Sequence, residues 1–232
     1  MRTPQFELLP RLVASLALAV SIPCWAAGPK AEWVPGEKKQ GNGYAYQVFS
    51  VQNEGEPFIR FQVRGTIDAP ADVVQRAASR VATDPARAPK GQKRTVLSKG
   101  EDETVLQTEI DLPAMFSDRD VITRGRSSVD PATGVRRIEF KSTEYASAPP
   151  KEGVIRLENT GGAWVFVPDG DSRSKVTFES YVDLGGSLPV WLISGQMAST
   201  AAGSFENVAH EALENGPRDA VSARGMGTVT GR

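Results

Sequence analysis

Apolar and polar residues alternate in the first part of the chain with the period of two that is typical of strands with one buried face. The run Tyr44–Phe49 begins this pattern, and Ile59–Arg64 continues it with an apolar residue at every second position. From Pro70 to Val81 the spacing changes to that of a helix. Its predicted apolar face contains Val73, Val74, Ala77, Ala78 and Val81. The pattern therefore predicts strands followed by one short helix.

The next part of the chain reads almost entirely as strands. The predicted strands are Thr95–Ser98, Thr104–Leu112, Asp120–Ser128, Val135–Thr143, Gly153–Asn159, Ala163–Pro168 and Lys175–Asp183. Segments rich in glycine, proline and aspartate, such as Asp130–Gly134, separate them as turns. The short connections between successive strands indicate antiparallel pairing.

A long apolar stripe from Trp191 to Leu213 predicts one helix that begins at Leu188-Pro189. Asn215-Gly216-Pro217 predicts its end, and residues 216–232 are expected to form a disordered tail. Many residues of this helix are small, which suits either close approach to a ligand or close packing on a sheet. The order of elements predicts an α+β domain in which a strongly bent antiparallel sheet wraps the long helix.

The N-terminal residues differ in character from the rest of the chain. Basic residues such as Arg11 flank the apolar run Leu12–Ile22, and the small residue Ala26 follows it. This is the pattern of a secretory signal peptide, and the run is shorter than the roughly 20 apolar residues of a transmembrane helix. We expect residues 1–26 to be a signal peptide, with an uncleaved anchor as the alternative, and residues 27–43 to be a linker or N-terminal segment. The protein is then exported, either periplasmic or secreted.

Composition and charge argue against several classes of function. The chain has 27 basic and 28 acidic residues and a formal net charge of −1, so no basic excess favours nucleic acid as a partner. Its only cysteine, Cys24, falls in the predicted signal peptide, which leaves no thiol for a disulfide, a nucleophile or a metal. Its only histidine, His210, is expected to face water. We therefore expect no catalytic residues, no metal site and no cofactor.

Three segments, in this order and spacing, resemble a START (StAR-related lipid-transfer) domain. They are Gly65–Val73, Leu112–Val121 with its Ser117-Asp118-Arg119-Asp120 core, and Val182–Leu192. The resemblance is to the exported bacterial branch of this family, within the wider START/Bet v 1-like helix-grip superfamily. We place the START-like domain at residues 44–215.

The resemblance implies an α+β helix-grip fold, in which a curved antiparallel β-sheet wraps around a long C-terminal α-helix and encloses a hydrophobic cavity. It also implies that the protein binds and transports a lipid or another hydrophobic molecule, with transient membrane contact. The segment Tyr145–Gly153 is similar to the loop that gates the cavity in this family. Such a cavity should be mainly apolar, with a few polar groups that orient the ligand.

The predicted ligand contacts are mostly large apolar side chains on the last strands and the last helix. They are Trp164, Phe178, Trp191, Leu192, Met197 and Phe205. Glu109 and Arg124 lie on adjacent predicted strands, and we expect such a pair to hold the polar head of a ligand. The alternative for this pair is an ordinary surface ion pair.

Two other classes of function remain open at this point. The superfamily includes polyketide cyclases and aromatases, and an enzyme of this kind would use Glu109, Asp111, Tyr181 or His210 in the same cavity. A protein-interaction module with a filled core is the other alternative. The Ser117–Asp120 cluster is interpreted as a structural turn, in which the carboxylates accept backbone N–H groups and pair with Arg119.

Overall fold

The sheet is built from strands in both halves of the chain, as the computed structural model of residues 32–185 and 190–225 shows. The strands are β1 (Val34–Gly41), β2 (Tyr44–Val51), β3 (Arg60–Ile67), β4 (Gln92–Lys99), β5 (Glu103–Ile110), β6 (Arg119–Val129), β7 (Arg136–Ser142), β8 (Ile155–Arg156), β9 (Thr160–Pro168) and β10 (Ser174–Val182). The helices are α1 (Ala71–Thr83) and α2 (Val190–Gly225), with a short 3₁₀ turn, η1 (Pro85–Arg87), after α1.

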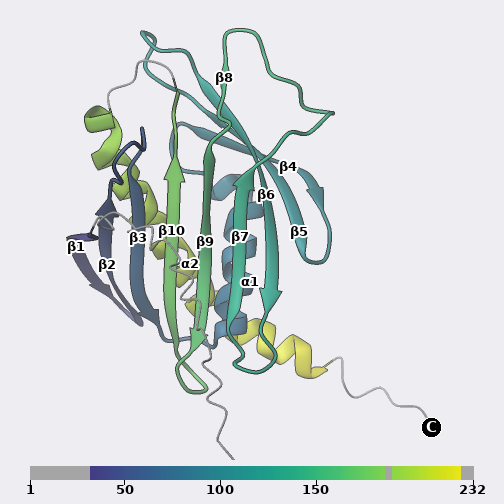
Figure 1. The fold of residues 1–232 in the computed structure, drawn as a ribbon. Coiled ribbons are helices and arrows are strands. Elements are labelled where there is room, and N and C mark those ends of the chain that lie inside the picture. Colours follow the sequence, from purple (N-terminus) through teal and green to yellow (C-terminus); the bar gives the residue numbers. More distant parts are fainter. Residues whose placement is uncertain (1–31, 186–189, 226–232) are drawn as a thin grey trace, which may run out of the picture. The chain divides into compact units, whose positions relative to one another are not determined.

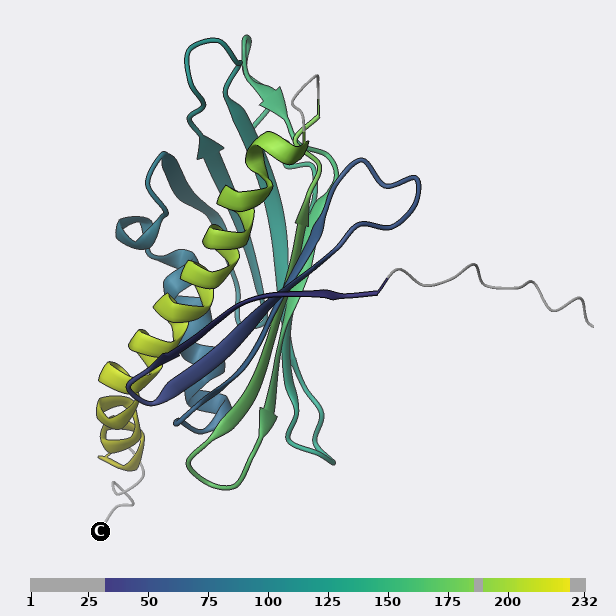
Figure 2. The same cartoon turned by 90° about the vertical axis from the view of Figure 1, so that its left-hand side faces the viewer.

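The strand order is β1-β2-β3-β10-β9-β7-β6-β5-β4, and β8 pairs with β6 off this path. All neighbours on the main path are antiparallel, whereas β8 runs parallel to β6. The pairing of β3 with β10 joins the N-terminal strands to the meander. Both helices cover the same face of the curved sheet, and α2 crosses it along its length (Figures 1 and 2).

The main core lies between the helices and the central strands, because alternate strand residues point toward the helices. Its most buried side chains include Val63, Ile67, Phe166 and Phe205, none of which has measurable solvent exposure. The apolar face predicted for α1 is confirmed, since Val73, Val74, Ala77, Ala78 and Val81 are all buried. The predicted α+β helix-grip fold, with its curved antiparallel sheet and long C-terminal helix, is therefore confirmed.

Element boundaries depart from the sequence-based expectations in three places. Strand β1 lies inside the segment predicted as a linker and pairs with β2 at the sheet edge. The predicted strand Gly153–Asn159 is reduced to the two residues of β8. Helix α2 continues to Gly225, past the stop predicted at residues 215–217.

The continuation of α2 has a physical explanation at Gly216. This glycine is buried, and a β-carbon there would collide with Val73 of α1. The glycine is thus required by the close approach of two helices and does not mark a helix end. The predicted signal peptide, residues 1–26, lies outside the described residues. In the part of the chain that the structure describes, no helix is long and apolar enough to cross a membrane.

Candidate ligand-binding site

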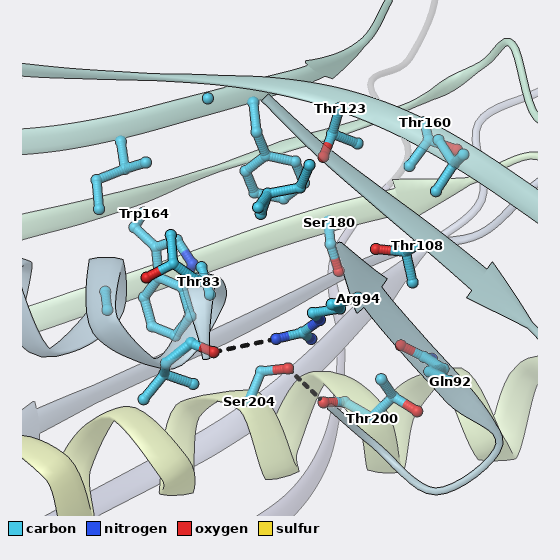
Figure 3. Close-up of a pocket in the computed structure, with 18 of the residues that line it drawn as sticks. Thr83, Gln92, Arg94, Thr108, Thr123, Thr160, Trp164, Ser180, Thr200 and Ser204 are labelled. Carbon is cyan, nitrogen blue, oxygen red and sulfur yellow. Dashed lines mark hydrogen bonds between the residues drawn. The ribbon is translucent and has the colours of Figure 1, made fainter. Parts of the chain in front are cut away.

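A cavity of about 430 Å³ lies between the two helices and the inner face of the sheet (Figure 3). Its walls come from the C-terminal end of α1, from α2 and from strands β4 to β7, β9 and β10. Small-molecule pockets in proteins usually measure about 300–1,000 Å³. The cavity therefore has the size of a site for a small ligand.

Because alternate residues of a strand point to opposite faces of the sheet, the lining residues of β5 and β6 lie at every second position. On β5 the inward residues are Thr104, Leu106, Thr108 and Ile110, and on β6 they are Val121, Thr123, Gly125 and Ser127. Helix α2 contributes one face at helical spacing, namely Met197, Thr200, Ala201, Ser204 and Val208. The pattern gives a wall in which apolar side chains and small hydroxyl groups alternate.

Stacked aromatic rings form the apolar part of the wall. The ring centroids of Trp164 and Phe178 are 4.2 Å apart, and those of Phe178 and Phe140 are 6.4 Å apart. These three side chains come from the neighbouring strands β7, β9 and β10 and all line the cavity. Aromatic side chains provide a large apolar contact area, so this cluster is suited to a hydrocarbon ligand.

Arg94 is the partly buried cation of the wall. Its side chain extends from β4 into the cavity, where one guanidinium nitrogen donates to the backbone oxygen of Val81 at 3.2 Å (Figure 3). The other charged lining residues are all exposed; they are Lys90, Lys99, Glu101, Asp102 and Asp111. Burial lowers the pKa of the Arg94 guanidinium below its ordinary value. An arginine nonetheless stays protonated in proteins, so the partly buried part of the wall carries a positive charge.

Three of the residues predicted to contact a ligand, Trp164, Phe178 and Met197, line the cavity. Phe205 is fully buried in the core beside Tyr46 and Trp164, and it is not part of the lining. The side chains of Trp191 and Leu192 lie outside the described residues. Contact of these residues with a ligand stays a prediction.

Glu109 and Arg124 are placed on the opposite face of the sheet from the cavity. The inward residues of β5 have even numbers and those of β6 odd numbers, so both side chains point away from the lining. Glu109 pairs with Lys151 and, at 3.7 Å, with Lys93, while Arg124 pairs with Glu103. The hydrogen bond from Lys151 lowers the pKa of the Glu109 carboxyl. The expectation that this pair holds a ligand head is corrected, since each residue forms its own outer ion pair.

The Ser117–Asp120 cluster is a structural turn, although its partners differ from those predicted. Asp118 accepts the backbone N–H of Leu112 at 3.0 Å, as expected. Arg119 donates to the backbone oxygens of Ser117 and Leu184, and not to a carboxylate. Asp120 instead pairs with Arg156 at 2.7 Å. The cluster therefore fixes the start of β6 and the position of β8.

The segment Tyr145–Gly153, predicted as a gate, lies across the outer face of the sheet. Tyr145 donates to the backbone oxygen of Leu97 at 3.4 Å, and Arg156 donates to that of Ala148 at 3.1 Å. None of residues 145–153 lines the cavity. Leu112, Val182 and Leu184 are instead among the lining residues.

The four residues that an enzyme of this fold would use for catalysis do not lie together. Asp111 is at the exposed margin of the cavity. Tyr181 stacks on Phe58 at 5.0 Å, outside the lining. His210 is exposed, as predicted, and its ring contacts Tyr44. Among the residues the structure describes, no cluster of three or more potential metal ligands is found.

Sequence reasoning missed Arg94 and the inward hydroxyl groups. Strand β4, Gln92–Lys99, has no apolar alternation that would show which side chains point inward. Strand β5 does alternate, and its pattern of Leu106 and Ile110 against Gln107 and Glu109 could have placed Glu109 on the outer face.

Comparison with known families gives one matching family model, the START domain, over residues 26–215. A phosphatidylcholine transfer protein from Bos taurus is 30% identical over 153 residues, which are 65% of each chain. The human phosphatidylcholine transfer protein is 32% identical over 94 residues, which are 40% of this chain and 44% of that protein. The matches thus span less than two thirds of these relatives.

Solved structures share the fold. A STAR-related lipid transfer protein from Xanthomonas axonopodis superposes with a TM-score of 0.63 at 22% identity, over 78% of this chain and 99% of that one. Human StAR-related lipid transfer protein 5 superposes with a TM-score of 0.60 at 17% identity, over 78% of this chain and 86% of that one. At these identities the likeness concerns the fold.

Proposed function

The chain belongs to the START domain family, and from this premise we propose that it binds one lipid in its cavity and carries it within the cell envelope. The observation that carries this proposal is the cavity itself, with its stacked aromatic wall under α2. Each 100 Å² of apolar ligand surface removed from water contributes about 2.5 kcal/mol to binding. Burial of a hydrocarbon chain is therefore enough to drive uptake without covalent chemistry.

Helix α2 is suited to act as the lid of this cavity. In the turns before Ala201, Gly195, Gln196 and Ser199 are exposed, while Ala201, Phe205, Val208 and Ala212 of the later turns are buried. Weakly packed segments open at a smaller free-energy cost than well-packed ones. A ligand would enter when the turns of α2 before Ala201 move away from the sheet.

The connection between β5 and β6 provides a candidate membrane contact. Met115 is 82% exposed, and Pro113 and Ala114 beside it are also exposed. Leu112 of the same connection lines the cavity. An exposed apolar loop next to the cavity could insert into a membrane surface and bring a lipid to the mouth.

The alternatives have less support. A filled-core interaction module would leave no room for a ligand, whereas this fold encloses about 430 Å³. A cyclase would need acidic or basic groups that converge on the cavity, and Glu109, Tyr181 and His210 lie outside its lining. We therefore propose a non-enzymatic carrier.

Export rests on the sequence of residues 1–26 and is part of the proposal. The test expresses the full chain in a bacterium with a periplasm and follows both its location and its N-terminus by mass spectrometry. Recovery from the periplasm with residues 1–26 removed is the expected result, and retention in the cytoplasm would contradict export.

Lipid binding is tested on the same material. The purified protein is measured by native mass spectrometry and its organic extract by lipid mass spectrometry. We expect one lipid per chain, or uptake of one lipid when candidates are supplied in vesicles. Protein that is empty after both treatments would overturn the proposed function.

A further inference from the structure

The cavity combines an apolar wall with one partly buried cation, Arg94, that no carboxylate neutralises. Arg94 points inward from the interior of β4, and its hydrogen-bond partner is the backbone oxygen of Val81 near the end of α1. In the part of the chain that the structure describes, no carboxylate lies within ion-pair distance of its guanidinium. A partly buried arginine with a single neutral acceptor leaves most of its donors unused.

An unpaired cation on an apolar wall is unfavourable unless a ligand supplies an opposite charge. Removing charge from water is costly, and hydrogen bonds to an oppositely charged group recover that cost. The planar guanidinium matches the oxygen atoms of carboxylates and phosphates. The wall is thus complementary to a ligand with an apolar chain and one negative group.

A second polar group of the lining, the hydroxyl of Thr160, is not available to a ligand. The hydroxyl oxygen of Thr160 is buried and forms no hydrogen bond in the described structure. Thr160 lines the same cavity as Arg94, and Figure 3 shows both among its lining residues. Its oxygen is buried within the protein and is not exposed to the cavity, so an occupant does not reach it and Arg94 is the polar anchor of the cavity.

We propose that the cargo is a single-chain anionic amphiphile whose carboxylate or phosphate group binds Arg94 inside the cavity. This inference rests on the proposed lipid-binding function and names the class of lipid. The size of the cavity supports one chain, because about 430 Å³ lies toward the lower end of the range for small-molecule sites. A lipid with two acyl chains would have to enlarge the cavity.

The test compares ligands that share a chain and differ in their head. Palmitate carries a carboxylate, 1-palmitoyl lysophosphatidate carries a phosphate, and 1-hexadecanol is neutral. Dipalmitoyl phosphatidylcholine has two chains, and inorganic phosphate and acetate have none. Affinities are measured with the full chain, delipidated by organic extraction and refolded, through displacement of a neutral fluorescent probe from the cavity.

Palmitate or lysophosphatidate should bind about 10-fold to 100-fold more tightly than 1-hexadecanol, as expected for charge-assisted hydrogen bonds. The head that binds more tightly identifies the source of the negative group. Inorganic phosphate and acetate should not bind, because they bury no chain. Tighter binding of phosphatidylcholine than of both single-chain anions would overturn the inference.

Arg94→Met should remove the preference for the anionic ligands and leave 1-hexadecanol unaffected. Lys93→Met is the matched control, because Lys93 is the neighbouring cation on the same strand and its side chain is exposed on the other face. The control should retain the preference. An unchanged preference in Arg94→Met would contradict the inference.

Two readouts separate the possible failures. Arg94→Met should bind the neutral probe and melt at or above the temperature of the unliganded wild type, since an uncompensated cation has been removed. A marked fall in melting temperature would assign Arg94 to the support of α1 through Val81 and count against a ligand role. If 1-hexadecanol binds as tightly as both palmitate and lysophosphatidate, the anion site is overturned and the carrier function stays intact, whereas binding of no amphiphile overturns both.

Discussion

At the scale of single residues, the ion pair of Asp120 and Arg156 joins β6 to β8 on the outer face of the sheet. The exposed fractions of the two side chains are 1% and 14%. Burial alone would raise the pKa of the Asp120 carboxyl, but hydrogen bonds from Arg156 and Gln107 outweigh it and lower this pKa. A carboxyl whose pKa is lower in the folded state than in the unfolded state stabilises the fold at pH values above its unfolded-state pKa. This stabilisation is lost as the pH falls through the folded-state pKa.

Asp120→Asn should therefore destabilise the protein by about 3–5 kcal/mol at pH 7, because Arg156 would keep a buried, unpaired charge. Urea unfolding at pH 7 and at pH 3 measures the effect. The difference from wild type should shrink at pH 3, because the Asp120 carboxyl of the unfolded wild-type chain, with a pKa of about 3.9, takes up a proton there and the folded state loses stability relative to it.

Asp72→Asn is the control for this prediction. Asp72 forms an ion pair with Arg76 on the exposed side of α1, so its loss should be at most about 1 kcal/mol. A loss in Asp120→Asn that is no larger than in this control would show that the buried pair contributes little.

At the scale of elements, α2 is fixed at its second half and loosely held beside the cavity. Glu211 is 5% exposed and pairs with Arg80 of α1 at 2.6 Å and with Arg87 of η1 at 2.5 Å. Asn215 donates to the same carboxylate at 3.0 Å. These contacts anchor the end of α2 that lies away from the proposed lid.

Glu211→Gln should lower the free energy of unfolding by about 1.5–3 kcal/mol, the usual contribution of hydrogen bonds to a charged group. Ligand affinity should change little, because Glu211 does not line the cavity. Chemical unfolding and ligand titration of the same sample test both statements. A large loss of ligand affinity with unchanged stability would show that Glu211 does not anchor α2.

The glycines of α2 give a second prediction at this scale. A β-carbon at Gly195 or at Gly203 would meet no atom within 4 Å. These two glycines therefore serve no close packing, and we expect Gly195→Ala and Gly203→Ala each to stabilise the helix by about 0.5–1 kcal/mol. In Gly195→Ala, which lies in the proposed lid, release of a bound fluorescent lipid, followed by stopped flow, should become slower because a stiffer lid opens less often.

Gly65→Ala is the contrasting variant for this measurement. Gly65 lies on β3, where a β-carbon would collide with the backbone oxygen of Ala45 and approach Phe205 of α2. This variant should lose stability. Loss of stability in the two α2 variants as well would contradict the assignment of Gly195 and Gly203 to an unpacked surface.

Elements whose pattern matches their burial could be predicted from the sequence. The apolar face of α1 and the alternation of β3 and β5 specify their orientation. Trp164, Phe178 and Met197 line the cavity, and their contact with a ligand stays a prediction. The two residues of β8 and the extended end of α2 could not be predicted, because tertiary contacts determine them. Arg94 was missed because β4 is polar on both faces.

At the scale of the whole molecule, the cavity leaves apolar lining without packing partners until a ligand fills it. A ligand that binds only the folded state stabilises it by about 2.7 kcal/mol at 100 times its dissociation constant. For a domain of this size, each kcal/mol raises the melting temperature by roughly 2–4 °C. Saturation with the cargo should therefore raise the melting temperature by about 5–10 °C.

Filling the cavity with a side chain should replace the ligand. Gly125 lines the cavity from β6, and a β-carbon there would lie 3.8 Å from the Thr104 oxygen and 4.0 Å from Phe140, which are ordinary contact distances. Gly125→Phe would place an aromatic ring in the cavity at little steric cost, and an aromatic residue suits a strand better than glycine does. We expect unliganded stability at or above the wild-type value, together with loss of lipid uptake and of the ligand-induced rise in melting temperature.

Ser128→Phe adds the same ring to an exposed position of the same strand and should leave uptake unchanged. The pair of variants separates occupation of the cavity from a change of surface hydrophobicity. If Gly125→Phe were folded and took up lipid as the wild type does, the ligand would have to bind elsewhere on the molecule. Loss of uptake in both variants would point to the membrane-facing surface, because the two substitutions share nothing but an added apolar ring.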